Sequence, residues 1–416
     1  MSYNNGGYTE QGSSQALQSG GNVAAAPAKS RRGLWIGVGV VAALLVLGGI
    51  GAGVGVAVSN KNKSQNAAVV PGAGDNSQSN SGSSSGSSGN NSTDTDNQYA
   101  NFAPTPGLQK IFYGMAYTPA GAVPDCKVSQ EDVIKDIQLM SQMTNIVRTY
   151  GAGCNVPGLV LNAIKLTKVD LKVYLGNYIT PGNDDSYNTQ KQTIEDALKQ
   201  YGHDNVLGVT VGNEVMLNAC LDKTITDANS PLVKDAADYI VAKIADTRSS
   251  LAALGFTNIK VGNSDAGSYF ATSVLEVSDY GLSNVHPWFA HTPVKDSVQW
   301  TWDFFEENNV QPAALLANKP EMVIAETGWP SGSKWANTTN NGAGEGGEAS
   351  IGNLQIFLDE WVCQSNAKGI KYFYFELFDE LWKDELYGGV EGYWGLLDSN
   401  KNLKPGITFP TCLISS

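Results

Sequence analysis

Basic residues are scarce in this sequence. It has 27 lysines and arginines against 40 aspartates and glutamates, which gives a formal net charge of -13 and a pI of about 4.7. This acidity argues against nucleic acid or an anionic surface as a partner of the folded part, because such polymers are bound by lysine and arginine. A neutral polymer is the partner that the charge favours.

Cysteine is also scarce, and its spacing lacks a common metal-binding pattern. No two cysteines form a C-x-x-C pair, so we expect no metal site. An odd number leaves one cysteine unpaired within the chain, and spacing alone does not fix the pairing. We also expect no cofactor. The five cysteines are Cys126, Cys154, Cys220, Cys363 and Cys412.

The amino-terminal region lacks hydrophobic periodicity and is followed by a long apolar run. Residues 1–33 are rich in Gly, Ser, Asn, Gln and Ala, which predicts a disordered tail. Residues 34–58 are apolar and uncharged. Because roughly 20 such residues cross the hydrocarbon core of a bilayer, we predict a transmembrane helix in contact with lipid.

A cleaved signal peptide is the alternative for residues 34–58, since Ala57-Val58-Ser59 offers small residues at a cut site. The run is longer than a usual signal core and follows a polar tail, which favours an uncleaved signal anchor. Three basic residues precede the run and two follow closely, a bias towards a cytoplasmic amino end. We therefore predict a single-pass type II protein of the plasma membrane.

Sequons support an outward orientation of the larger part. Acceptor asparagines in Asn-x-Ser/Thr patterns occur at Asn90, Asn91 and Asn337, and glycosylation would require the secretory side. Residues 59–101 are dominated by Ser, Gly, Asn and Asp, which predicts a flexible tether that spans on the order of 35 Å. The folded part would then stay near the membrane and face the cell wall.

Residues 102–416 alternate strand and helix signals. Eight such strand patterns with helical stretches between them predict one (β/α)8 barrel of the α/β class. A doubly wound open sheet is the alternative, but no Gly-rich phosphate turn follows the first strand. The predicted strands are 111–118, 145–151, 172–179, 206–214, 259–266, 282–289, 322–327 and 372–377, and the helices include 129–143, 190–201, 231–254, 298–308 and 351–366.

Two predicted strands end at a carboxylate. Glu214 ends the fourth strand and Glu326 lies near the end of the seventh, just before Gly328-Trp329-Pro330. In a barrel both would enter one cleft from opposite sides, as glycosidic bond cleavage requires. Aromatic faces for sugar stacking are expected nearby, although interior packing is the commoner fate of tryptophan. The candidates are Trp288, Trp329, Trp335, Trp382 and Trp394.

These two stretches resemble a known family. Val211-Gly212-Asn213-Glu214 and Ile324-Ala325-Glu326-Thr327-Gly328-Trp329-Pro330-Ser331 are similar to the signatures of glycoside hydrolase family 17, the β-1,3-glucanases. The likeness covers about residue 108 to the end. The layout of tail, anchor, tether and catalytic domain is similar to membrane-anchored fungal glucan endo-1,3-β-glucosidases.

The resemblance implies roles for named residues. It makes Glu214 the general acid/base, Glu326 the nucleophile of a retaining mechanism, Asn213 the partner of the substrate 2-hydroxyl and Tyr117 the residue that orients the nucleophile. It pairs Glu380 with Lys383 in a supporting role, for which an ordinary surface ion pair is the equal alternative. His286-Pro287-Trp288-Phe289 departs from the Tyr-Pro-Tyr-Phe of plant members, so glucan contacts along that rim would differ.

The implied chemistry is endo-hydrolysis of cell-wall β-1,3-glucan. Glu214 must hold a proton while Glu326 stays ionised, and retaining enzymes place such carboxyl groups about 5 to 5.5 Å apart. A transglycosylase that passes the sugar to another glucan shares the same intermediate and is not separated by sequence. A non-catalytic glucan-binding wall protein is the third possibility, but it predicts loss of a catalytic glutamate, and both are present.

Overall fold

The structure is a computed structural model, and it describes residues 98–412. Among these residues, no helix is both long and apolar enough to cross a bilayer. The predicted tail, the transmembrane helix at 34–58, nearly all of the tether, and the sequons at Asn90 and Asn91 lie outside the described residues.

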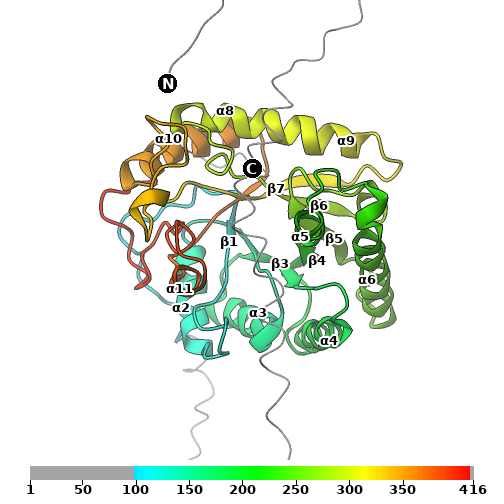
Figure 1. The fold of residues 1–416 in the computed structure, drawn as a ribbon. Helices are drawn as coiled ribbons and strands as arrows, with labels where there is room; N and C mark the ends of the chain where they lie inside the picture. Colours follow the sequence, from blue (N-terminus) through cyan, green and yellow to red (C-terminus); the bar gives the residue numbers. More distant parts are fainter. Residues whose placement is uncertain (1–97, 413–416) are drawn as a thin grey trace, which may run out of the picture.

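Eight parallel strands close into a barrel in the order β1 to β8, and helices surround it (Figure 1). Closure comes from β1 against β8, where Gly114 pairs with Phe373 and Met115 with Tyr374. The predicted barrel is confirmed. The strands are β1 Gly114–Ala116, β2 Ile146–Arg148, β3 Lys172–Asn177, β4 Val206–Asn213, β5 Lys260–Ala266, β6 Tyr280–Asn284, β7 Glu321–Thr327 and β8 Tyr372–Tyr374.

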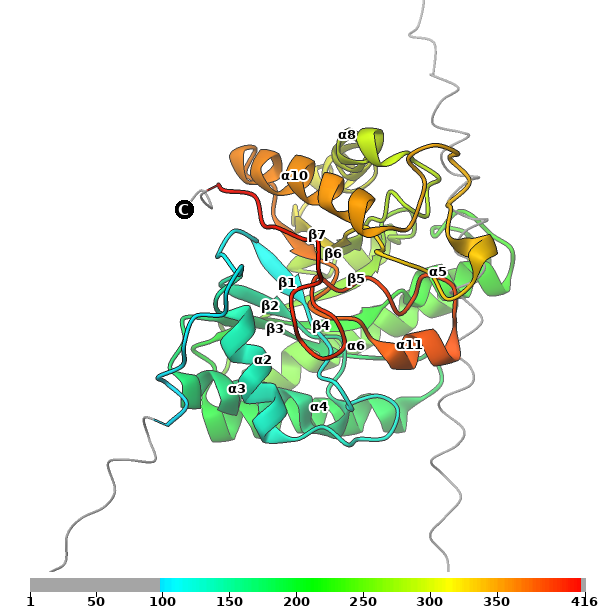
Figure 2. The same ribbon diagram turned by 90° about the vertical axis from the view of Figure 1, so that its left-hand side faces the viewer.

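The helices form the outer layer. In Figure 2, α8 and α10 lie on one side of the strands, and α2, α3 and α4 lie on the opposite side. The α-helices are α2 Gln130–Met140, α3 Val156–Thr167, α4 Asp184–Tyr201, α5 Val215–Asp222, α6 Lys234–Ala253, α7 Thr272–Leu275, α8 Val294–Phe305, α9 Gln311–Ala314, α10 Ile351–Ala367 and α11 Leu381–Leu386. Shorter 3-10 or π turns are η3 Gly153–Asn155, η4 Pro231–Val233, η5 Glu306–Val310 and η6 Ala336–Thr338.

Helix α2 shows how local sequence sets an element. Ser129 caps it by accepting the Asp132 N–H at 3.1 Å, and acidic residues follow in the first turn, where they face the positive end of the helix dipole. Its apolar residues recur at helical spacing and are buried against the barrel, with Val133 and Ile137 fully covered. Sequence and packing therefore agree at this helix.

Among the strands, the largest difference from the predicted boundaries is in the sixth. It was expected over 282–289, but β6 ends at Asn284, because Pro287 cannot continue a hydrogen-bonded strand. Helix α3 has no counterpart among the named helical stretches, because Pro157 and Gly158 near its start are breakers in sequence. In the structure Pro157 occupies the first turn of α3, where its missing N–H costs nothing.

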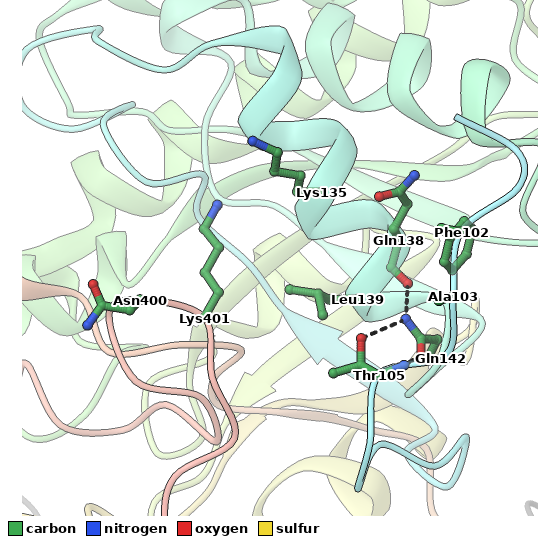
Figure 3. A pocket seen from close by; sticks show the side chains of 9 residues that line it. All are labelled: Phe102, Ala103, Thr105, Lys135, Gln138, Leu139, Gln142, Asn400 and Lys401. Carbon is green, nitrogen blue, oxygen red and sulfur yellow. Dashed lines mark hydrogen bonds between the residues drawn. The ribbon is translucent and has the colours of Figure 1, made fainter. Parts of the chain in front are cut away.

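The first described residues pack against α2 (Figure 3). The Thr105 N–H donates to Gln142 Oε1 at 2.6 Å, and Gln142 Nε2 donates to the Gln138 carbonyl at 2.9 Å. A pocket of about 300 Å³ lies here, and it includes neither Glu214 nor Glu326. Its lining is Phe102, Ala103, Thr105, Lys135, Gln138, Leu139, Gln142, Asn400 and Lys401.

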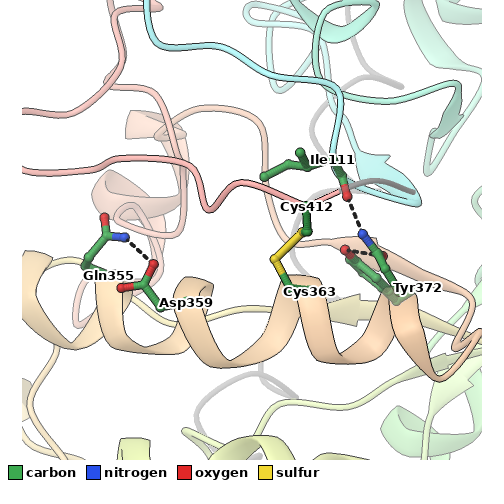
Figure 4. Close-up of a disulfide and its surroundings, with 7 residues drawn as sticks. Ile111, Gln355, Asp359, Cys363, Tyr372 and Cys412 are labelled. Atoms are coloured by element: carbon green, nitrogen blue, oxygen red, sulfur yellow. Dashed lines mark hydrogen bonds between the residues drawn. A yellow bond between two sulfur atoms is a disulfide. The ribbon is translucent and has the colours of Figure 1, made fainter. Parts of the chain in front are cut away.

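Two disulfides join segments of the barrel domain. Cys126 bonds Cys154 between the loops after β1 and β2, and Cys363 on α10 bonds Cys412 in the carboxyl-terminal segment (Figure 4). Cys220 on α5 is buried and unpaired, so the expected odd cysteine is identified.

Candidate active site

Glu214 follows directly on β4 and is the N-cap residue of α5. Its backbone adopts the left-handed conformation, with φ 57° and ψ 32°, which non-glycine residues rarely adopt. The side chain is partly buried, and Asn284 Nδ2 donates to its Oε1 at 3.0 Å. Burial, and then the negative charge of Glu326, raise the pKa of Glu214 to about 7, against the opposing hydrogen bond from Asn284.

Glu326 lies near the carboxyl end of β7 and is only 6% exposed. Arg148 Nη1 donates to its Oε1 at 3.2 Å, and His286 Nε2 lies 3.0 Å from its Oε2. Burial alone would raise the pKa of Glu326. The hydrogen bond from His286 and the charge of Arg148 outweigh burial, so its pKa lies below the ordinary value of 4.5.

Arg148, the last residue of β2, joins the two glutamate sites. Nη1 donates to Asn284 Oδ1 at 3.1 Å as well as to Glu326, and Nη2 donates to Asn213 Oδ1 at 2.6 Å and Ser264 Oγ at 2.8 Å. The side chain is 1% exposed. Because Asn284 also bonds Glu214, one network of residues from β2, β4, β5, β6 and β7 holds both carboxylates in one site.

Sequence reasoning missed Arg148, although a signal was present. Arginine is almost never fully buried without a partner, and here it stands inside the apolar run that predicted the second strand. Asn284, which ends β6, was missed as well. In the sequence it stood within the predicted strand 282–289 rather than at its end, so no strand-end position pointed to it.

Asn213 lies where the resemblance places it, next to Glu214 in the chain. Its Oδ1 accepts from Arg148, from Ser264 Oγ at 3.1 Å and from Asn284 Nδ2 at 3.3 Å. The oxygen of this side chain is therefore engaged by protein donors. Any hydrogen bond from Asn213 to a sugar hydroxyl would be made by its NH2 group.

The expected role of Tyr117 is wrong. Its hydroxyl donates to Asp136 Oδ2 on α2 at 2.8 Å, not to Glu326. Asp136 is fully buried and also pairs with Lys401 Nζ at 2.5 Å. Tyr150, just beyond β2, is the tyrosine whose hydroxyl helps to lower the pKa of Glu326. The Tyr150 hydroxyl is buried without a hydrogen-bond partner, however, and the side chains that are hydrogen-bonded to Glu326 are Arg148 and His286.

Glu380 and Lys383 form a buried cluster rather than a surface pair. Lys383 Nζ lies 2.6 Å from Glu380 Oε2 and 2.9 Å from Glu376 Oε2. Both glutamates are at most 4% exposed. Glu376 and Glu391 were not singled out in the sequence, and burial raises the pKa of Glu391 to about 7. The cluster borders the site, since Lys383 lowers the pKa of Glu214 and Glu391 repels it.

The predicted stacking role of Trp329 is wrong, and that of Trp288 is not supported. Trp329 is fully buried, and its Nε1 donates to the Glu348 carbonyl at 2.9 Å. Trp288 is 7% exposed and packs edge-on against Phe289 at a centroid distance of 5.3 Å. Trp335, in contrast, is 47% exposed in the loop after β7. Interior packing therefore explains the first two tryptophans.

His286 begins the stretch that departs from the pattern of plant members. In the structure it lies against the nucleophile candidate Glu326. Three aromatic rings enclose it, with centroids between 5.1 and 5.8 Å away: Phe289, Phe375 and Trp394. Asn337, the one sequon among residues 98–412, is exposed in η6, as a glycan acceptor must be.

A (β/α)8 barrel with an acidic pair at the ends of β4 and β7 defines the class of a glycoside hydrolase. The profile of the BtgE/BtgC glycoside hydrolase domain matches residues 114–395. The chain therefore belongs to this family, and the resemblance stated from its two glutamate motifs is confirmed.

Relatives from other fungi agree with this assignment. The chain is 35% identical over 325 residues to the probable glucan endo-1,3-beta-glucosidase btgC of Aspergillus fumigatus, covering 73% of this chain and 44% of that protein. It is 35% identical over 321 residues to the glucan endo-1,3-beta-glucosidase btgC of Emericella nidulans, covering 74% and 47%. The match thus spans less than half the length of these relatives.

A solved structure of similar fold is the glycoside hydrolase family 17 beta-1,3-glucanosyltransferase of Rhizomucor miehei. The sequences are 26% identical and the TM-score is 0.57, with 72% of this chain and 98% of that chain covered. The barrel and its family are therefore supported both by sequence and by three-dimensional similarity.

Proposed function

We propose that the barrel domain cleaves β-1,3-glucan by a retaining mechanism, with Glu326 as nucleophile and Glu214 as general acid/base. One observation carries the proposal: a shared network holds two glutamates whose pKa values are moved in opposite directions. A retaining glycosidase needs one carboxyl group protonated and one ionised at the same pH. The names of the btgC relatives, glucan endo-1,3-beta-glucosidases, supply the substrate class.

In the first step the Glu326 carboxylate attacks the anomeric carbon while the bond to the glycosidic oxygen breaks. Glu214 gives its proton to that oxygen, so the leaving glucan departs as an alcohol and Glu214 becomes a carboxylate. Loss of the proton from Glu214 is helped by Lys383 and Arg148, whose charges favour its ionised form. The sugar is then held as an ester of Glu326.

In the second step Glu214, now ionised, takes a proton from an incoming hydroxyl that attacks the anomeric carbon. The Glu326 ester bond breaks, and the Glu326 carboxylate returns to its contacts with Arg148 and His286. These two side chains stabilise the departing carboxylate because they favour its charged form. Asn213 supplies its NH2 group to the 2-hydroxyl of the bound sugar.

Transfer to a second glucan instead of water is the other candidate function. The solved structure of the Rhizomucor miehei glucanosyltransferase, 26% identical to this chain, favours keeping it. Both outcomes use the same residues and differ only in the hydroxyl that attacks the ester. A purely glucan-binding role is not favoured, since the paired glutamates carry the electrostatics that turnover needs.

Product sizes test the proposal. The purified protein is incubated with linear β-1,3-glucan and with laminari-oligosaccharides, and products are followed over time. New reducing ends with shorter products support endo-hydrolysis, and products longer than the donor support transfer. Absence of both, with folding confirmed by circular dichroism, rejects the enzymatic assignment.

The proposed setting of the enzyme is the outer face of the plasma membrane. Residues 34–58 would anchor it in the bilayer as a type II protein, and residues 59–101 would tether the barrel beside the wall. Asn90, Asn91 and Asn337 are the proposed glycosylation sites. Fractionation of cells with a tagged chain, followed by glycosidase treatment, tests this: recovery of an unglycosylated chain in the soluble fraction contradicts it.

A further inference from the structure

Helix α5 begins directly after the acid/base candidate, and this creates a capping problem. An N-cap side chain normally accepts a hydrogen bond from the first-turn N–H groups of its helix. Glu214 occupies the N-cap position of α5, but its side chain makes no capping bond. Instead its Oε1 accepts from Asn284 in the site. The first turn of α5 therefore needs an acceptor from elsewhere.

Asp265 on the neighbouring strand β5 supplies that acceptor. The Met216 N–H donates to its Oδ2 at 2.8 Å, and the Leu217 N–H donates to its Oδ1 at 3.1 Å. The Ala266 N–H donates to Oδ1 at 2.9 Å. The side chain is fully buried. Burial raises the pKa of Asp265 well above its usual range, and the three N–H hydrogen bonds oppose this shift. Since both oxygens accept and all three partners are donors, the geometry favours the carboxylate form.

Ser264, the residue before Asp265, binds the backbone of the acid/base candidate Glu214. The Glu214 N–H donates to the Ser264 carbonyl at 3.1 Å. Residues 264 and 265 thus accept hydrogen bonds from the backbone N–H groups of Glu214, Met216 and Leu217. This matters because Glu214 has a positive φ of 57°, a conformation that is unfavourable for a non-glycine residue unless its surroundings enforce it.

The charge of Asp265 is as important as its geometry. The amino end of a helix carries partial positive charge and favours an ionised carboxyl group beside it. A general acid at an N-cap would therefore lose its proton too readily. A buried carboxylate on the first-turn N–H groups counters that charge, and the two carboxyl groups are close enough to repel each other.

We propose that Asp265 is the positioning residue of the general acid: it caps α5 in place of Glu214, enforces the backbone of Glu214 and screens it from the positive end of the helix. This inference rests on the proposed function of Glu214. It assigns a role in catalysis to a residue that touches no substrate.

The titration of Glu214 also depends on the other groups around it. Glu326, Glu391 and Asp265 favour its protonated form, whereas the cations and the amide donor favour its ionised form. The groups that face or influence Glu214 are Arg148 from β2, Tyr178 beyond β3, Asp265 from β5, Asn284 from β6, Glu326 from β7, Lys383 from α11 and Glu391 beyond α11. Among these, Asp265 is the one bonded to the first turn of α5.

Asp265→Asn tests the proposal, because it keeps the shape and removes the charge. One N–H of α5 then faces an amide NH2 group instead of an oxygen. For laminari-oligosaccharides, whose leaving group must be protonated, kcat/KM should fall about a hundredfold. For dinitrophenyl β-laminaribioside, whose leaving group needs no proton, it should fall less than about threefold. In the pH dependence of kcat/KM on laminari-oligosaccharides, the alkaline limb should move to lower pH by about one unit.

Asp279→Asn is the matched control. Asp279 Oδ2 accepts the Val261 N–H at 2.7 Å near the start of the same strand, far from the strand end that carries the site. Its substitution should change neither the ratio of the two activities nor the alkaline limb. Equal losses on both substrates in Asp265→Asn, or an unshifted limb, overturn the proposal, because general destabilisation would produce that result.

A second variant covers a failure of Asp265→Asn to fold. Asp265→Glu keeps the charge but displaces the carboxylate, so oligosaccharide activity should fall selectively while the alkaline limb stays in place. Equal loss on both substrates in this variant also overturns the proposal. The unmodified protein is measured first on both substrates: if it cleaves neither, the proposed function fails, whereas a negative result confined to the variants rejects only the role of Asp265.

Discussion

Glu214 and Glu326 are the same amino acid at equivalent places, the carboxyl ends of β4 and β7, yet the barrel treats them in opposite ways. Burial acts on both and disfavours their charged forms. Glu326 receives a guanidinium and an imidazole, and its pKa falls. Glu214 receives one neutral amide donor and the repulsion of Glu326, and its pKa rises to about 7.

The comparison shows that chemical role is assigned by partners from other strands. Asn284 illustrates this, because its NH2 group donates to Glu214 while its oxygen accepts from Arg148. A single amide thus donates to Glu214 and accepts from the cation that is hydrogen-bonded to Glu326. The two glutamates differ because Arg148 and His286 are hydrogen-bonded to Glu326 and not to Glu214.

The largest test of the comparison is Glu326→Gln. It removes the nucleophile and the charge, and we expect kcat on laminari-oligosaccharides to fall by about 10⁴-fold or more. Affinity for the glucan, measured by calorimetry, should remain largely intact because the amide keeps the shape. Substantial turnover by this variant would contradict the assignment of Glu326.

Glu214→Gln should have a smaller and substrate-dependent effect. General acid catalysis contributes roughly 10²–10⁴-fold, so cleavage of laminari-oligosaccharides should fall by that factor. Attack on dinitrophenyl β-laminaribioside should persist, because that leaving group departs without a proton. The control is Glu326→Gln, which must lose both activities. Equal loss of both activities in Glu214→Gln would break the division of roles.

His286→Phe should make the ionised form of Glu326 less stable, because it removes a hydrogen bond to that carboxylate. Loss of a hydrogen bond to a charged group costs about 1.5 kcal/mol, which corresponds to roughly a tenfold lower kcat/KM at acidic pH. Since the His286 hydrogen bond lowers the pKa of Glu326, its removal should move the acid limb to higher pH. His286→Tyr restores a donor and should shift the limb less. An acid limb that stays in place in His286→Phe excludes this role.

The pH profile of the unmodified protein sharpens the comparison without any substitution. Activity requires ionised Glu326 and protonated Glu214. As pH falls through the lowered pKa of Glu326 the nucleophile is lost, so the acid limb of kcat/KM should lie below 4.5. As pH rises through the pKa of Glu214 the proton donor is lost, so the alkaline limb should lie near 7. An alkaline limb below about 5 would contradict the raised pKa of Glu214.

The two glutamates were predictable because each is marked by a local sequence pattern. An apolar run that stops at a carboxylate is visible along the chain, and eight alternations predict the barrel that brings strand ends together. Trp329 shows the limit of such reasoning. It follows the nucleophile closely in the chain, but its ring is turned into the interior, where it stacks on Phe357 at 6.4 Å.

The supporting residues were less predictable because they act across the barrel. Arg148 is separated from Glu326 by 178 residues in sequence, yet the two side chains are hydrogen-bonded. Tyr117 and Tyr150 both follow short buried strands, and nothing local says which hydroxyl approaches the nucleophile. Their positions depend on the register of β1 and β2 and on the buried Asp136, which accepts the hydrogen bond of the Tyr117 hydroxyl.

By itself, the sequence determined the barrel and its pair of glutamates, because hydrophobic periodicity and helix or strand breakers are local properties. It also determined the net negative charge and the presence of an unpaired cysteine, which follow from composition. The tertiary structure supplied the physical reason why Glu214, as the resemblance implied, is the glutamate that holds a proton, since a pKa is set by burial and by charges from other strands. It also decided that Asp265 rather than Glu214 caps α5. That choice depends on the close approach of β5 to the start of α5, which no single stretch of sequence contains.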